Sequence, residues 1–144
     1  MGGSKFLSAL IDTTDEVIQA NDLVQSFIIA CSDESSDLET GNNKCRIRMP
    51  YAFTLTAVRA SVNTAPTGST ISIQITEAGS DILSTPITID ASELTSVSAA
   101  AAPVISDNSL ADDAIIGIDL DQVGSSNAGT GLKVTLIGYK TTVG

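Results

Sequence analysis

Residues 45–62, which read CRIRMPYAFTLTAVRASV, show the pattern from which the fold can be inferred. In the first half of this stretch every second residue is apolar, a pattern typical of a β-strand with one buried face. The apolar positions are Cys45, Ile47, Met49 and Tyr51. Arg46 and Arg48 occupy the positions between them, so we expect both arginines on the opposite, exposed face.

In the second half of the stretch the alternation shifts by one residue. Phe53 and Leu55 stand at odd positions, whereas Val58, Ala60 and Val62 stand at even ones. One added residue turns every later side chain of a strand to the other face. The shift therefore predicts a β-bulge, or a bend where a long strand passes from one sheet to another.

The same alternation continues on both sides of this stretch. It predicts strands near residues 27–31, 44–50, 53–62, 70–76, 81–89, 103–106, 114–122 and 132–140. Residues 91–103 are expected to form a crossover connection. About eight short strands separated by turn residues are typical of a β-sandwich, and the jelly roll is its eight-stranded form. We therefore expect an all-β, jelly-roll-like antiparallel sandwich over residues 25–144.

Residues 1–24 lack this alternation. Four apolar residues fit one face of a helix: Phe6, Leu7, Leu10 and Ile11. Thr13 and Glu16 have the spacing of a capping box. An extended arm is an equal alternative, because polar pairs at residues 13–14 and 21–22 interrupt a long helix. The predicted organisation is an N-terminal arm over residues 1–24, with or without a short helix, before the β-domain.

Composition excludes several classes of function. The 144 residues contain no histidine, which removes histidine-based acid–base catalysis and histidine metal sites. The net charge of −10 repels phosphate backbones, so nucleic acid is not expected as a partner. No apolar run is long enough to cross a bilayer. The apolar stretch that Asp12 ends is too short for a secretory signal, so we expect a protein made in a cytoplasm.

Few residues have the pattern of a catalytic or metal site. Carboxylates that could bind calcium cluster near one loop, at Asp107, Asp112, Asp113, Asp119 and Asp121. No EF-hand loop is present, and plain solvation of these side chains is the favoured interpretation. Cys31 and Cys45 are expected to be small buried residues, although a bridge between them is conceivable. We expect no enzyme activity, no cofactor and no bound metal.

Arg46 and Arg48 are the most informative charged pair, because they share one strand face in an acidic chain. One interpretation is internal pairing with the acidic residues of segment 33–39. The other is docking onto an acidic partner surface. Together with the apolar residues of the arm, they are the candidate partner contacts: Phe6, Leu7, Leu10, Ile11, Arg46 and Arg48.

Residues 45–62, followed by TAPTGS at residues 64–69, resemble a family of tailed-bacteriophage virion proteins. The resemblance continues in ILST at 82–85, TIDASE at 88–93, SLADD at 109–113 and LKVTLIG at 132–138. It covers residues 27–140, and MPYA at 49–52 and APTG at 65–68 are its most specific parts. The N-terminal arm lies outside it, where a docking arm would be expected.

The resemblance implies a jelly-roll domain, usually assembled as a trimer, and brings no catalytic residues. Related domains occur in capsid decoration (cement) proteins and in head or tail fibres. We therefore expect a structural protein on the capsid surface of the virion, assembled in the host cytoplasm, whose partners are the major capsid protein and two further copies of itself. The alternative is a receptor- or glycan-binding fibre domain that uses loops such as residues 124–131.

Overall fold

The computed structural model describes residues 23–141, which form an all-β domain of short antiparallel strands. The first strands are β1 (Gln25–Ala30), β2 (Gly41–Arg48), β3 (Phe53–Ser61) and β4 (Ile71–Glu77). They are followed by β5 (Ser80–Asp81), β6 (Leu83–Thr85), β7 (Ile87–Ile89), the 3-10 helix η2 (Ser96–Ser98), β8 (Val104–Ile105) and β9 (Ser109–Leu110). The last two are β10 (Ile115–Gln122) and β11 (Lys133–Lys140).

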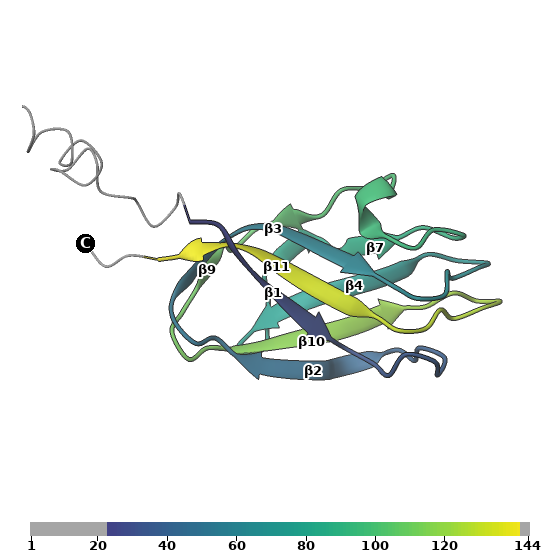
Figure 1. The fold of residues 1–144 in the computed structure, drawn as a ribbon, viewed down its shortest axis with the longest axis horizontal. Helices are drawn as coiled ribbons and strands as arrows, with labels where there is room; N and C mark the ends of the chain where they lie inside the picture. The colour runs from purple at the N-terminus through teal and green to yellow at the C-terminus, as the bar shows by residue number, and fades with distance from the viewer. Residues whose placement is uncertain (1–22, 142–144) are drawn as a thin grey trace, which may run out of the picture.

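The strands form two main sheets. One has the order β1-β11-β3-β9, and the other has the order β2-β10-β4-β5, with β7 also paired to β4 (Figure 1). From β1 to β4, and again from β9 to β11, the chain passes to the opposite sheet at every connection. This interleaved order is that of a jelly roll, and the predicted all-β sandwich is confirmed.

The core lies between the two sheets. The isoleucines of β4, Ile71, Ile73 and Ile75, are fully buried, as the alternation predicts. Inward-facing residues of β10 and β11 meet them, including Ile116, Ile118, Leu120, Val134 and Leu136. Burying one such side chain stabilises the fold by about 1.5–3 kcal/mol.

The shift in alternation within residues 53–62 is a β-bulge in β3. Ala57 pairs with Ile137, but Leu55 pairs with Gly138, so Thr56 is the additional residue. A side chain at position 138 would collide with the carbonyl oxygen of Thr54, which explains the glycine. The bulge alternative is therefore confirmed, whereas the passage between sheets occurs earlier, over residues 49–52.

The strand count differs from the prediction over residues 81–89. This segment forms three short strands rather than one, because Pro86 separates β6 from β7 and cannot donate a backbone hydrogen bond. β6 pairs with β8 in a small separate sheet, and β7 returns to β4. The crossover over residues 91–103 contains η2, whose first turn is capped by the side chain of Thr95.

Candidate functional site

The two arginines from the sequence analysis lie on β2, at the edge of the five-stranded sheet. Both side chains are exposed, while the neighbouring Cys45 and Ile47 are partly buried against the core. Lys44 is also exposed, but the register of β2 on β10 shifts before Cys45, and its side chain lines a different hollow, at segment 31–40. We call Arg46 and Arg48 the basic edge.

Arg48 has a partner, but not the predicted one. Its Nη1 atom lies 3.2 Å from Asp113 Oδ2 and donates to the Asp113 carbonyl oxygen at 3.0 Å. Pairing with segment 33–39 is therefore wrong for Arg48, because that segment leads into the first residue of β2 and Arg48 is at the other end of the strand. The acidic segment pairs elsewhere: Glu34 forms an ion pair with Lys133 at 2.6 Å. Exposed pairs of this kind stabilise a fold by at most about 1 kcal/mol.

Arg46 has no ion pair among residues 23–141. It lines a shallow hollow on the outer face of the sheet, together with Asn43 and Thr76. Gly117 lies beneath these side chains: an added Cβ there would stand 2.5 Å from Asn43 Oδ1 and 2.7 Å from Thr76 Oγ1. The hollow thus combines a guanidinium, an amide and a hydroxyl, groups that can bind a carboxylate.

The backbone of β2 is unpaired on one side within the described part of the chain. Its single strand partner there is β10. Just past the strand end, Met49 N donates to Ala114 O at 2.9 Å and Asp113 N donates to Met49 O at 3.0 Å, toward the β10 side. Because alternate residues of an antiparallel pair direct their backbone groups to the same neighbour, those of Arg46 and Arg48 point away from β10.

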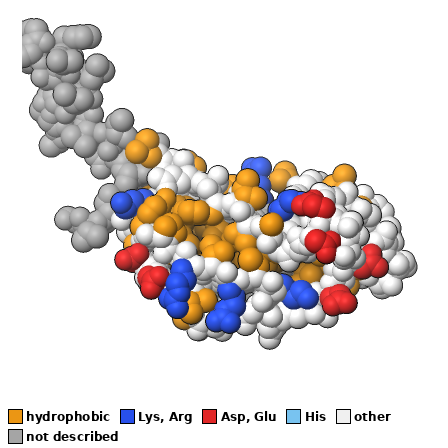
Figure 2. Space-filling view, turned by 60° about the horizontal axis from the view of Figure 1, so that its bottom comes forward, with side chains coloured by type: hydrophobic (Ala, Val, Ile, Leu, Met, Phe, Trp, Pro, Cys, Tyr) orange, Lys and Arg blue, Asp and Glu red, His pale blue; other side chains and the backbone are white. Residues whose placement is uncertain are grey.

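A band of apolar side chains is visible between β1 and β2, the edge strands of the two sheets. It consists of Phe27, Cys45, Ile47 and Tyr51, which are partly exposed while packing against the core. Figure 2 shows hydrophobic side chains gathered on this side, with Lys and Arg side chains along one margin. Within the apolar band, the ring centroids of Phe27 and Tyr51 are 6.1 Å apart. The Nζ atom of Lys140 lies 5.2 Å from the centroid of the Tyr51 ring.

The carboxylates considered for calcium do not converge. Asp119 accepts a hydrogen bond from Asn43 N at 2.7 Å, Asp107 accepts one from Ser109 N, and Asp113 pairs with Arg48. Burial raises the pKa of the Asp121 carboxyl, and the charges of Asp119 and Asp81 add to this effect. Across residues 23–141 no group of three or more acidic or cysteine side chains is arranged to hold a metal ion.

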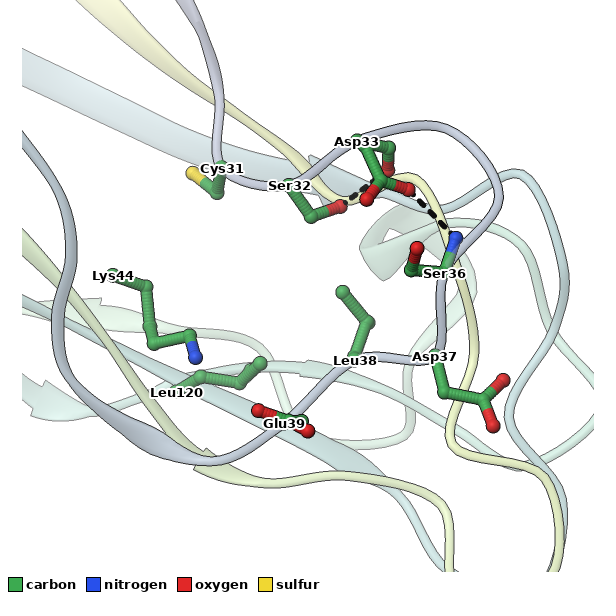
Figure 3. Close-up of a pocket in the computed structure, with 9 residues that line it drawn as sticks. All are labelled: Cys31, Ser32, Asp33, Ser36, Asp37, Leu38, Glu39, Lys44 and Leu120. Carbon is green, nitrogen blue, oxygen red and sulfur yellow. Dashed lines mark hydrogen bonds between the residues drawn. The ribbon is translucent and has the colours of Figure 1, made fainter.

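A second hollow lies at the opposite end of β2, where segment 31–40 joins β1 to β2 (Figure 3). Two of its polar side chains, those of Ser32 and Asp33, form hydrogen bonds that shape the turn. Ser32 Oγ donates to the Asp33 carbonyl oxygen at 2.7 Å and accepts from Leu132 N, while the Asp33 carboxylate accepts from the amides of Ser35 and Ser36. These amide donors lower the pKa of Asp33. The hydroxyl group of Ser32 and the carboxylate of Asp33 therefore serve the folding of this turn.

The two cysteines are free. Cys31 is buried, as the sequence predicts, and Cys45 is only partly buried. Burial raises the pKa of the Cys31 thiol to about 12, with the adjacent Cys45 adding to the shift. Because the thiolate is the reactive form, Cys31 is an inert core residue at neutral pH.

The remaining candidate contacts, Phe6, Leu7, Leu10 and Ile11, lie outside the described residues.

Sequence reasoning also missed parts of the site that the structure brings together. Lys44 continues the alternation of the two arginines in the sequence, but it is not one of these parts, because it lines the hollow at segment 31–40. Asn43 and Thr76 carry no comparable signal, since only the pairing of β2, β10 and β4 places them beside Arg46.

No family model, curated protein or solved structure matches this chain. The resemblance to phage virion proteins thus stays a prediction. Within residues 23–141 no helix has the length and apolar character needed to cross a membrane.

Proposed function

We propose that the protein is a structural component of a bacteriophage virion, a decoration protein that binds the assembled head shell and stabilises it. The observation that carries this proposal is the basic edge: an exposed cationic strand edge, unpaired within residues 23–141, in a chain of net charge −10. A surface of this kind favours an acidic protein partner.

The chemistry of the described residues supports a binding role rather than catalysis. The hydroxyl group of Ser32, in the hollow at segment 31–40, serves its own turn, and the Cys31 thiol is protonated at neutral pH. The exposed acidic side chains near β10 are held apart by separate partners. A decoration protein needs no reacting group, because it acts by favouring the assembled shell to which it binds.

We further propose that the protein acts as a homotrimer whose partner is the major capsid protein. Three weak contacts joined in one assembly bind far more tightly than one, provided that all three can engage together. Light scattering should give the mass of three chains, and a monomer at virion-like concentrations would remove this part of the proposal.

The test of decoration uses capsids from virions that lack the protein. We expect the full chain to bind them and to raise the temperature at which they release DNA. Arg46→Ala with Arg48→Ala should weaken binding at least tenfold, whereas Arg59→Ala, an exposed arginine on β3 of the other sheet, should not. Replacing Phe6, Leu7, Leu10 and Ile11 by serine tests the arm separately. Equal DNA release with and without the protein would contradict a stabilising role.

The fibre alternative is tested by position in the virion. Labelled antibody should mark the head surface, whereas label at the tail together with binding to a glycan array would favour the receptor-binding alternative. The loop expected to serve that role, residues 124–131, contains no aromatic side chain on which a sugar could stack. Near the end of this loop, the backbone of Thr130 forms isolated antiparallel β-bridges with Asp37 and with Thr64.

A further inference from the structure

We propose that the free edge of β2 binds an extended segment of the partner as an added strand, and that this segment carries carboxylates at alternate residues with apolar residues between them. The inference rests on the proposed function only in assigning the segment to the shell protein. The mode of binding follows from three features of β2.

The first feature is the backbone. The amide and carbonyl groups of Arg46 and Arg48 point away from β10, because the odd-numbered residues of β2 face that strand. An extended peptide laid beside β2 would pair with these groups and so extend the five-stranded sheet. Strand addition of this kind gives affinity through main-chain hydrogen bonds and specificity through alternate side chains.

The second feature is the spacing of charge. Side chains two residues apart on a strand lie about 6.5–7 Å apart on the same face. A partner strand with carboxylates at alternate positions would therefore present them in register with Arg46 and Arg48. Arg46 offers the better site, because it has no ion pair within residues 23–141. Arg48 would exchange or share its exposed contact with Asp113.

The third feature is the apolar band on the inner side of β2. Cys45 and Ile47 alternate with the arginines and are only partly buried, and Phe27 and Tyr51 continue the band toward β1. An added strand would turn its second face toward this band. Apolar residues on that face of the added strand would cover the partly exposed side chains of the apolar band. The bound segment must therefore alternate acidic with apolar residues, and acidic residues alone would not suffice.

Edge strands also carry charges that prevent association between sheets. If the basic edge served that purpose alone, no peptide sequence would be preferred. The chain's own N-terminal segment is a further possible occupant, since it contains Asp12, Asp15 and Glu16. Both alternatives give outcomes distinct from the one proposed.

The test is an NMR titration of the isotope-labelled full chain with capped synthetic peptides. The alternating probe is Glu-Val-Glu-Thr-Glu-Val-Glu, and its control has the same composition with the four glutamates in one block. We expect the alternating peptide to bind at least tenfold more tightly, to shift the amide signals of Arg46 and Arg48, and to slow hydrogen exchange at those amides. Arg46→Glu should abolish the preference, and Arg59→Glu should leave it unchanged.

Equal binding of the two peptides, or shifts confined to another surface, would overturn the proposal. The full chain with Asp12, Asp15 and Glu16 changed to the corresponding amides is the last arm of the test. A tenfold gain in peptide affinity for that variant would identify the chain's own segment as the occupant and would also overturn it. The peptide titration contains no capsid, so its result does not depend on whether the protein binds capsids. Failure of the strand-addition proposal can therefore be distinguished from failure of the proposed decoration function.

Discussion

The two edges of the sandwich differ in how fully the apolar residues between the sheets are covered. On the side of β7 and β9, the crossover that contains η2 covers the space between the sheets: Val62 N donates to Leu94 O at 3.0 Å, and Ala60 N donates to Ser96 Oγ at 2.9 Å. Ile87, Ile89 and Leu110 are at most 1% exposed there. On the side of β1 and β2, the apolar band stays partly exposed.

This difference suggests separate roles for the two sides, one in the stability of the fold and the other in binding. The closed side excludes water from its apolar residues, so it contributes more to the free energy of folding. The open side leaves apolar surface and backbone groups available, and a partner can gain from covering them. Substitutions on the two sides should therefore differ in their effects on folding and on reactivity.

Replacing a core isoleucine should destabilise the fold more than replacing one at the open side. Ile73→Ala should lower the free energy of unfolding by about 2–5 kcal/mol, because it leaves a cavity in a fully buried site. Ile47→Ala should cost about half as much, since its side chain is already partly solvated. Urea unfolding followed by circular dichroism measures both. Equal losses would mean that the β2 edge is covered in the protein's own assembly.

The cysteines show how far the open side extends. With the pKa of its thiol raised from 9.0 to about 12, Cys31 should have a thiolate fraction at pH 8 about three orders of magnitude below that of an exposed cysteine. Iodoacetamide should therefore modify the partly exposed Cys45 and leave Cys31 unmodified until the chain unfolds. Mass spectrometry of digested protein identifies the site. Cys45→Ser should remove the reaction, and rapid double modification would show that segment 31–40 does not cover Cys31.

Gln74, a buried polar residue on the closed side, should stabilise the fold through its hydrogen bonds. Gln74 Nε2 donates to Leu83 O at 3.0 Å, and Gln74 Oε1 accepts from Leu83 N at 3.2 Å. Gln74→Leu should leave both backbone groups of Leu83 unpaired and cost about 1–3 kcal/mol. Gln122→Leu is the matched control, because Gln122 is exposed and bonded to Thr70 O. Hydrogen exchange at Leu83 should accelerate in the first variant alone; unchanged exchange there would argue against this role of Gln74.

Much of this architecture follows from alternation, because a two-residue period reports which face of a strand is buried. The isoleucines of β4 and the bulge in β3 are examples, since each depends on residues close together in the sequence. Contacts between distant segments leave no such local signal. The partner of Arg48 is 65 residues away, in the turn before β10, and charge alone favoured the wrong acidic segment.

The openness of one side was equally inaccessible to sequence reasoning. Cys45 and Ile47 have the same pattern as the buried residues of β4, yet they lie on an edge strand that has no further strand beside it within residues 23–141. Strand order decides this, and strand order depends on which distant segments pair. The arginines were found because charge is visible in the sequence, whereas their unpaired backbone became visible only in the sheet.

Glu34, in the loop beside the open side, should make only a small contribution to stability that depends on pH. Hydrogen bonds from Lys133 and Asn63 hold the pKa of Glu34 below its usual value of 4.5. The unfolded chain therefore binds the proton more readily, and the stability that Glu34 contributes is present above its unfolded pKa and lost as pH falls through the folded one.

Glu34→Gln should accordingly reduce the fall in melting temperature when the pH is lowered from 7 to 3, measured by thermal unfolding at low salt. Glu39→Gln is the control on the same loop, because Glu39 forms neither an ion pair nor a side-chain hydrogen bond within residues 23–141. The difference should shrink in concentrated salt, since Glu34 is exposed and its ion pair with Lys133 is screened. A pH dependence that is the same in both variants would mean that the Lys133 contact does not persist in solution, and segment 31–40 would then be less firmly attached to β11 than the structure indicates.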